Sequence, residues 1–336
     1  MTQFLTRFFA WLVPLFGVFF VIHNYLIFWQ GWPGALSTIQ GITDAGSAVP
    51  SEMAALGWGQ LISWAVLLAL VGLYSAKQGQ TLLRADADRL SAIAAFIIRG
   101  SFWGIVLIGI CDIIISFLRV EELLEPVLGE TIGKELGRPI FRGTYVHYPL
   151  LLIGFVIAFF TRRLGFIWLT LLVVLAEFSI VISRFVYSYE QAFQGDLVRF
   201  WYAGLFLFAS AYALLTEGHV RVDVLYTNFS GRGKAWANTF GILLLGLPLC
   251  WIILTTGMWG KGSSLNSPLM SFEIYQQGFG MYVKYLMVGF LVIFAVSMLF
   301  QFCAYLLSNV ADLLGEPSDE EEEDGPVQTA ELPNEA

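Results

Sequence analysis

Apolar stretches of membrane-spanning length, separated by short polar segments, make up most of the chain. A helix needs about 20 mostly apolar residues to cross roughly 30 Å of hydrocarbon. Eight stretches approach or exceed this length, and they cover residues 8–29, 57–76, 93–118, 146–161, 164–188, 199–216, 236–258 and 282–308. The pattern predicts an all-α integral membrane protein with about eight transmembrane helices.

The first and fourth stretches each admit a second interpretation. Residues 8–29 resemble a signal peptide, but signal sequences have an apolar part of only about 7–15 residues and a small-residue cleavage site, which Trp29–Pro33 does not supply. We therefore expect a retained anchor. Residues 146–161 are short, and only Thr161–Leu164 separates them from the next stretch. A tight helical hairpin is the preferred interpretation, and a re-entrant segment is the alternative.

The composition agrees with a membrane protein. Of the 336 residues 57% are hydrophobic and 13% are charged, whereas soluble domains carry about 25% charged residues. This composition excludes a soluble enzyme, a nucleic-acid binder with basic patches and a disulfide-stapled secreted domain. The three cysteines, Cys111, Cys250 and Cys303, lie in apolar stretches without pairing or metal-ligand spacing.

The net charge of −8 comes from the C-terminal end of the chain. Nine acidic residues lie between Glu316 and Glu335, and the tail from Gly315 to Ala336 has no aromatic residue. Such a segment buries too little apolar surface to fold, so we expect residues 311–336 to include a disordered acidic tail. The tail either only increases solubility or binds a partner.

Lys and Arg in the loops predict the orientation, because cytoplasmic loops carry an excess of both. With the N-terminus inside, the cytoplasmic segments hold nine: Arg7, Lys77, Arg84, Arg89, Arg162, Arg163, Arg221, Arg232 and Lys234. The other side holds six: Arg119, Lys134, Arg138, Arg142, Arg199 and Lys261. We therefore expect both termini in the cytoplasm. On the outer side, residues 119–136 mix charges of both signs and form either an amphipathic helix on the membrane surface or a solvated face.

Ionisable residues within the apolar stretches are candidates for function, since charge in the bilayer is costly. Arg99 and Lys284 lie near helix ends and can reach the interface. Glu177 lies at the middle of 164–188, so we expect it to be protonated, paired or turned toward protein. Asp112 and Arg119 repeat the seven-residue spacing of Glu177 and Arg184, which indicates either an internal parallel repeat or, more simply, a coincidence.

No reaction centre is visible in the sequence. Walker-type, HExxH, CxxC and GxSxG motifs are absent. His23 and His147 both fall in the predicted outer half and could in principle ligate a haem, although satisfied or interfacial histidines are the commoner case. Pro14, Pro149 and Pro248 do not form the matched pair of helix interruptions that marks a translocation path. We expect no enzymatic activity, no cofactor and no metal site.

Three motifs in the second half of the chain carry a family resemblance. They are Ser183–Tyr187 at a helix end, Asp196 before Phe200–Tyr202, and above all Glu217–Tyr226, which reads EGHVRVDVLY directly after a predicted helix. Over about residues 164–310 the chain resembles the small membrane subunit, the DctQ-like family, of tripartite ATP-independent periplasmic (TRAP) transporters. It is most similar to the mannitol/chloroaromatic-type branch. Gly241, Leu247–Pro248, Ser263–Ser267, Lys284 and Gln301 fit the same pattern.

The resemblance implies a function and partners. A TRAP system has a periplasmic substrate-binding protein, a large membrane subunit that moves an organic acid with Na+, and a small subunit that braces the large one. The chain would then be a multi-pass protein of the bacterial inner membrane that contacts the two other proteins and membrane lipids, but no nucleic acid. The alternatives are a haem- or quinone-linked electron-transfer subunit and a self-sufficient transporter.

The expected organisation has three parts. Residues 1–161 form an additional N-terminal region of about four helices, 162–310 form the DctQ-like four-helix region, and 311–336 form the acidic tail. Val220, Val222 and Val224 alternate with polar residues, which predicts an amphipathic segment that either anchors to the membrane surface or contacts a subunit. Candidate residues for subunit or membrane interfaces are Glu177, Arg184, Asp196, Trp201, Glu217, His219, Arg221, Asp223 and Lys284.

The predicted orientation is testable with single cysteines in a background that lacks the native ones. Cysteines that replace cytoplasmic residues should be shielded from an impermeant thiol reagent in intact cells, and those that replace outer residues should be labelled. The shielded positions are Gln80, Gly231 and Gly325, and the labelled positions are Ser47, Gly129 and Ser264. Labelling of the Gly231 variant from outside would overturn the orientation.

Overall fold

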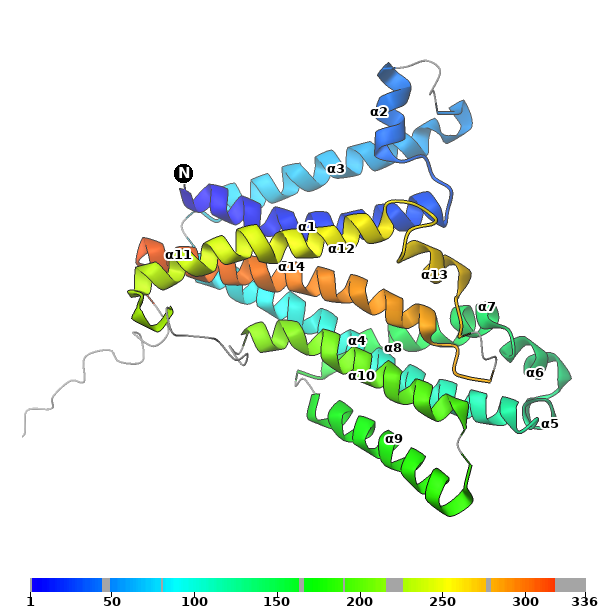
Figure 1. Cartoon of the computed structure of the whole chain (residues 1–336). Coiled ribbons are helices and arrows are strands. Elements are labelled where there is room, and N and C mark those ends of the chain that lie inside the picture. Colours follow the sequence, from blue (N-terminus) through cyan, green and yellow to red (C-terminus); the bar gives the residue numbers. More distant parts are fainter. Residues whose placement is uncertain are drawn as a thin grey trace, which may run out of the picture.

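The described part of the chain is a bundle of helices (Figure 1). The computed structural model describes residues 2–43, 49–79, 81–162, 166–189, 191–215, 226–275 and 279–317, and these contain no strand. Eight helical segments among them are long and apolar enough to cross a membrane. They are α1 (Thr2–Phe28), α3 (Ser51–Lys77), α4 (Leu83–Val120), α7–η2–α8 (Pro139–Phe160), α9 (Phe166–Tyr187), α10 (Ala192–Leu215), α11–η4–α12 (Gly231–Met258) and α14 (Lys284–Leu314). The predicted fold class and number of spans are confirmed.

Shorter elements connect these helices. They are α2 (Ala35–Thr43), α5 (Leu124–Leu128), α6 (Glu130–Leu136), η3 (Tyr226–Asn228) and α13 (Asn266–Ser271). Two long segments contain a π-helical turn, η2 (Gly143–His147) between α7 (Pro139–Arg142) and α8 (Tyr148–Phe160), and η4 (Ile242–Gly246) between α11 (Gly231–Gly241) and α12 (Leu247–Met258). In each case a proline, Pro149 or Pro248, follows two residues after the turn. Proline lacks the N–H that would continue the regular hydrogen-bond pattern, which explains why both segments change pitch here.

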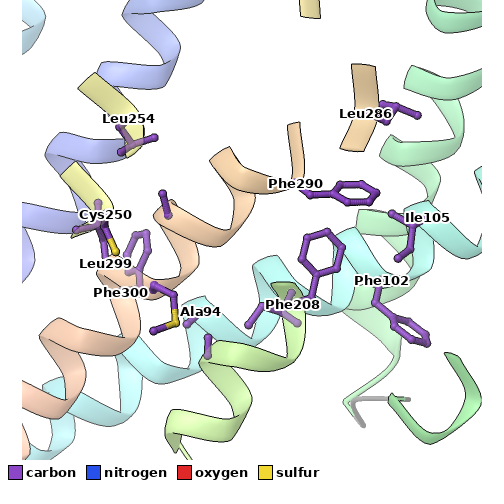
Figure 2. Packing of buried hydrophobic residues seen from close by; sticks show 14 of the residues in the cluster. Ala94, Phe102, Ile105, Phe208, Cys250, Leu254, Leu286, Phe290, Leu299 and Phe300 are labelled. Atoms are coloured by element: carbon purple, nitrogen blue, oxygen red, sulfur yellow. The ribbon is translucent and has the colours of Figure 1, made fainter. Parts of the chain in front are cut away.

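Helices α4 and α14 form the centre of the bundle. Helix α4 packs against α8, α10 and α14, and α14 also packs against α1, α11 and α12. In Figure 2 the side chains of Phe208 on α10 and Phe290 on α14 point toward one another, with ring centroids 5.1 Å apart. Ile105 of α4 is buried in the same cluster. The central helix of the predicted N-terminal region is therefore also part of the core of the C-terminal helices.

Glycines allow α4 and α8 to approach closely. Gly100 and Gly104 lie one turn apart on α4, and Gly154 faces them from α8. A methyl group at Gly154 would lie 2.4 Å from the Gly104 amide nitrogen and 2.8 Å from the Gly100 carbonyl oxygen. This is the small-residue packing by which membrane helices gain van der Waals contact in the absence of a hydrophobic driving force.

The structure differs from the sequence-based expectations in two details: α4 is longer than its apolar part, and the alternative of one amphipathic helix over residues 119–136 is not formed. Helix α4 begins at Leu83, ten residues before the predicted 93, and its 38 residues extend for about 57 Å, nearly twice the roughly 30 Å of the hydrocarbon core. Its charged first turns continue the helix beyond the apolar part. Residues 119–136 do not form one helix, because Glu122 and Gly129 have positive φ and divide the segment into α5 and α6.

Both ends of the described chain lie at the same end of the bundle (Figure 1). Arg7 donates hydrogen bonds to the carbonyl oxygens of Gln78 and Thr81, and Arg84 pairs with Asp312 near the end of α14. This arrangement fits an even number of crossings. Arg7, counted on the inner side, and Arg142, counted on the outer side, are both buried and ion-paired. Leaving both out of the count of loop charges does not change the difference between the two sides. Which end faces the cytoplasm stays a prediction, and residues 318–336 of the acidic tail lie outside the described residues.

Candidate functional site: a buried polar network

A fully buried carboxylate, Asp112 of α4, is the centre of a polar network at the end of the bundle opposite the N-terminus. Its Oδ1 accepts hydrogen bonds from Arg142 Nη1 and His147 Nε2, each at 3.0 Å. Its Oδ2 accepts one from the backbone N–H of Tyr282 at 2.9 Å. Three different segments, α7–η2, α4 and the residues before α14, therefore meet at one carboxylate.

All three nitrogen atoms of the Arg142 guanidinium group donate hydrogen bonds within the protein. Its Nε and Nη2 donate to the Leu136 carbonyl oxygen at 3.0 and 2.8 Å, and its Nη1 also donates to Ser116 Oγ at 3.1 Å. Its side chain is 0% exposed, as is that of Asp112. A buried ion pair is tolerated only when hydrogen bonds satisfy the remaining donors and acceptors, and this pair meets that condition.

His147 links Asp112 to Tyr285 of α14. Because Asp112 Oδ1 only accepts, His147 Nε2 carries the proton that it donates, and Nδ1 forms a hydrogen bond with the Tyr285 hydroxyl at 2.9 Å. The result is a chain from Tyr285 through His147 to Asp112 that joins α14, η2 and α4.

The segment Gly280–Tyr282 is held by α4 and α10. Asp196 of α10 accepts from the Met281 N–H at 3.0 Å. Arg119 of α4 donates to the Gly280 carbonyl oxygen at 2.7 Å and to the Tyr282 hydroxyl. The guanidinium groups of Arg119 and Arg142 both lie over the Tyr282 ring, 4.3 and 4.2 Å from its centroid. We call Asp112, Arg119, Arg142, His147, Asp196, Tyr282 and Tyr285 the strap network.

The strap network is suited to holding helices together. Every charged group in it has an opposite charge or several hydrogen bonds, and Trp201 adds a further link by donating to the Ile105 carbonyl oxygen at 3.1 Å. The described residues contain no group of three or more His, Cys, Asp or Glu side chains that could hold a metal ion. What the arrangement can do is fix α4, α8, α10 and α14 relative to one another.

A second buried pair lies at the opposite end of the bundle. Arg7 Nε pairs with Asp86, and both side chains are 0% exposed. Tyr74 of α3 donates to the same carboxylate at 2.5 Å. Helices α1, α3 and α4 are thus joined at one end, as α4, α8, α10 and α14 are joined at the other.

The two histidines that could have formed a haem site have other partners. His23 contacts Gln60 Oε1 through Nδ1 at 2.9 Å and Ser63 Oγ through Nε2 at 3.0 Å. Both nitrogens of His147 are likewise used. Neither imidazole has a nitrogen free for axial ligation, so the geometry does not fit a haem held by this pair.

Asp196, Trp201 and Lys284, which are also predicted interface residues, make contacts within the chain. Asp196 and Trp201 are only 5% exposed and bond as described above. Lys284, at the first turn of α14, pairs with Glu273 and lies over the Tyr275 ring. These three residues therefore fix the C-terminal helices to one another and to α4.

Glu177 and Arg184 both lie on the exposed surface of α9. Ala176 is the buried neighbour, and α9 packs extensively against α10 alone among the described elements. Glu177 therefore makes no packing contact with the described helices of residues 1–161. That its side chain is turned toward another protein stays a prediction. Glu217, His219, Arg221 and Asp223 lie outside the described residues.

Sequence reasoning did not identify most of the strap network. Arg142 was counted as a loop charge, and His147 was expected to be a satisfied or an interfacial histidine, although a signal for their pairing with Asp112 was present. Asp112 lies within an apolar stretch, Arg142 lies shortly before the next apolar stretch, and His147 lies at its start. Buried charges in membrane segments usually pair, so this acid-to-base pairing was a possible inference.

Replacing Asp112 by Asn should strongly destabilise the protein. The substitution keeps the side-chain shape but leaves Arg142 buried without a counter-charge, and breaking a buried pair costs about 3–5 kcal/mol. The matched control is Glu130→Gln, which removes an exposed pair with Lys134 and should cost at most about 1 kcal/mol. Unfolding of the purified protein in detergent measures both. Equal stability of the two variants would contradict the role given to Asp112.

Comparison with known proteins gives one match. Residues 171–312 match the family model described as "Tripartite ATP-independent periplasmic transporters, DctQ component". Neither the curated proteins nor the solved structures contain a match to the chain. The matched segment begins within α9 and includes α10, α11–α12 and nearly all of α14. This family is a transporter component and not an enzyme family. The chain thus contains a DctQ-family domain, that of the small membrane subunit of TRAP transporters, at residues 171–312.

Proposed function

We propose that the protein is the small scaffold subunit of a TRAP-type secondary transporter. It braces a large, elevator-type membrane subunit during Na+-coupled uptake of an organic acid that a periplasmic binding protein delivers. The transporter operates in the bacterial inner membrane and belongs to the mannitol/chloroaromatic-type branch. The observation that carries this proposal is the DctQ match over four helices, because DctQ proteins work with a large membrane subunit and a periplasmic binding protein.

The internal bonding supports a bracing role. A subunit that resists a moving neighbour must not itself deform, and buried polar networks stiffen a unique arrangement when all members are satisfied. Here Arg7–Asp86 and the strap network secure opposite ends of the bundle. The close contact of α4 with α8 and α14 secures the middle.

Helix α9 is the proposed contact with the large subunit. It lies at the edge of the bundle (Figure 1) and presents exposed apolar side chains such as Val174, Phe178 and Val181 around Glu177. An ionisable side chain at mid-helix costs about 2.5–3.5 kcal/mol if it faces lipid. A polar partner on another subunit removes this cost. The amphipathic stretch 217–226 is a second candidate contact, with a plain membrane-surface anchor as its alternative.

Reconstitution tests whether the chain moves substrate by itself. Proteoliposomes that contain only this chain should take up no organic acid, even with a Na+ gradient and a binding protein, because transport resides in the large subunit. Adding the large subunit should give uptake that depends on all three proteins. Uptake by this chain alone would contradict the scaffold role and favour a self-sufficient transporter.

Substitutions at Glu177 test the contact on α9. Glu177→Gln keeps the shape and hydrogen-bonding capacity and should be tolerated, whereas Glu177→Leu should reduce co-purification of the large subunit by about tenfold, which is the effect of losing one hydrogen bond to a charged group. Val181→Leu, an exposed change one turn away, is the control and should have no effect.

Two outcomes at Glu177 would contradict this assignment. If Glu177→Leu assembles more stably and transports normally, the side chain faces lipid. If Glu177→Gln assembles normally but abolishes transport, the carboxyl group acts through its protonation and not as a contact.

A further inference from the structure

Two arginines lie close together where α8 ends. Arg162 is the second residue after α8 and is exposed, and Arg99 of α4 is partly exposed. Their guanidinium groups are near enough for the two positive charges to repel each other. Irregular backbone that faces lipid lies outside the hydrocarbon core, so the connection between the spans α8 and α9 marks a membrane–water interface. The two arginines are therefore at or near this interface.

Contacts of α4 with the end of α8 fix the position of Arg99. Phe96, Arg99 and Trp103 recur at intervals of three and four residues, which places them on one face of α4. The Phe96 ring packs against Phe159, with centroids 4.7 Å apart. Trp103 Nε1 donates to Thr161 Oγ1 at 3.2 Å. Arg99 lies between these two contacts on the same face of α4, so it faces the end of α8.

Arg99 and Arg162 have no counter-charge within the described part of the chain. Neither forms an ion pair or a hydrogen bond with a described residue, and of the Arg99 nitrogens only Nε is buried, so the two terminal nitrogens are accessible. The other arginines of α4 all bond inside the protein, namely Arg84, Arg89 and Arg119. An anion bound between two like charges removes their repulsion. The unused donors and the repulsion both indicate an anionic ligand from outside the chain.

Exposed apolar side chains lie on both sides of Arg162 in the chain. Phe159 and Phe160 end α8, Ile167 and Trp168 lie in the first turn of α9, and all four are largely exposed. In a membrane these side chains contact acyl chains, and tryptophan is enriched at the level of the lipid head groups. A small soluble anion would leave them uncovered. A lipid phosphate carries acyl chains that cover them, so the surroundings favour a phospholipid over a free anion.

We propose that Arg99 and Arg162 bind the phosphate group of an anionic phospholipid where α4, α8 and α9 meet the membrane surface. Guanidinium groups bind phosphate oxygens through paired hydrogen bonds, and basic sites between membrane helices bind anionic lipid head groups. Two positive charges without an acid favour a head group of net negative charge over a zwitterionic one. The bound lipid would join α4 to α9, which packs extensively against α10 alone among the described elements. The site involves no transported substrate and does not depend on the proposed function.

Native mass spectrometry of the purified full chain in detergent tests the proposal. The probes are phosphatidylglycerol, which is anionic, phosphatidylcholine with the same acyl chains, which is zwitterionic, and inorganic phosphate. Phosphatidylglycerol should saturate one site and bind at least about tenfold more tightly than phosphatidylcholine, and an excess of inorganic phosphate should not displace it. Equal binding of the two lipids, displacement by phosphate, or absence of a saturable site would overturn the proposal.

Variants locate the site. Arg99→Gln and Arg162→Gln each remove one guanidinium group, and both should weaken binding of phosphatidylglycerol at least about tenfold. The matched control is Arg138→Gln, which replaces an exposed arginine that pairs with Glu135 and should bind the lipid normally. Because Arg162 is exposed, its variant should keep the melting temperature of the parent. If this variant still binds the lipid like the control, the arginines do not form the site, and loss of the large subunit in its place would identify a protein contact.

Discussion

A carboxylate buried within a membrane-spanning helix must have its charge neutralised, and the arrangement around Asp112 follows from this constraint. Arg142 supplies the counter-charge, and His147 and the Tyr282 amide supply further hydrogen bonds. Arg142 and His147 come from α7–η2, and Tyr282 comes from the segment before α14. These groups must occupy fixed positions to satisfy one carboxylate. The positions of η2, of the segment before α14 and of α4 are therefore set together.

Helix α4 connects the two parts of the chain. It belongs by sequence to the N-terminal region, yet it packs against α10 and α14, which lie within the DctQ match. Arg119 and Asp112 of α4 hold the same short segment that Asp196 of α10 holds. The N-terminal helices are therefore not an appended module, since α4 contributes to the core of the C-terminal helices. This continuity fits the proposed scaffold, because force on α9 or α10 would be distributed over the whole bundle.

The sequence was sufficient to predict the spans and insufficient to predict how they pack. Spans follow from apolar length, a local property, so all eight could be found. The start of α4 was missed because helix continues through charged turns such as that of Asp86, which apolar length does not detect. Partners of buried charges depend on tertiary contacts, so Arg142 was assigned to a loop although it is fully buried, and the partners of the equally buried His147 were not identified. For Glu177, the position at mid-helix predicted a contact with protein, whereas in the structure the side chain lies on the exposed surface of α9.

Cleavage of the connection between α8 and α9 tests most directly whether the two parts form one unit. A protease site inserted within residues 161–165 of the full chain would be cut after purification in detergent. The account predicts that the two fragments stay associated on size-exclusion chromatography and unfold in a single transition. Separation of the fragments, with the C-terminal one still folded and monodisperse, would contradict it.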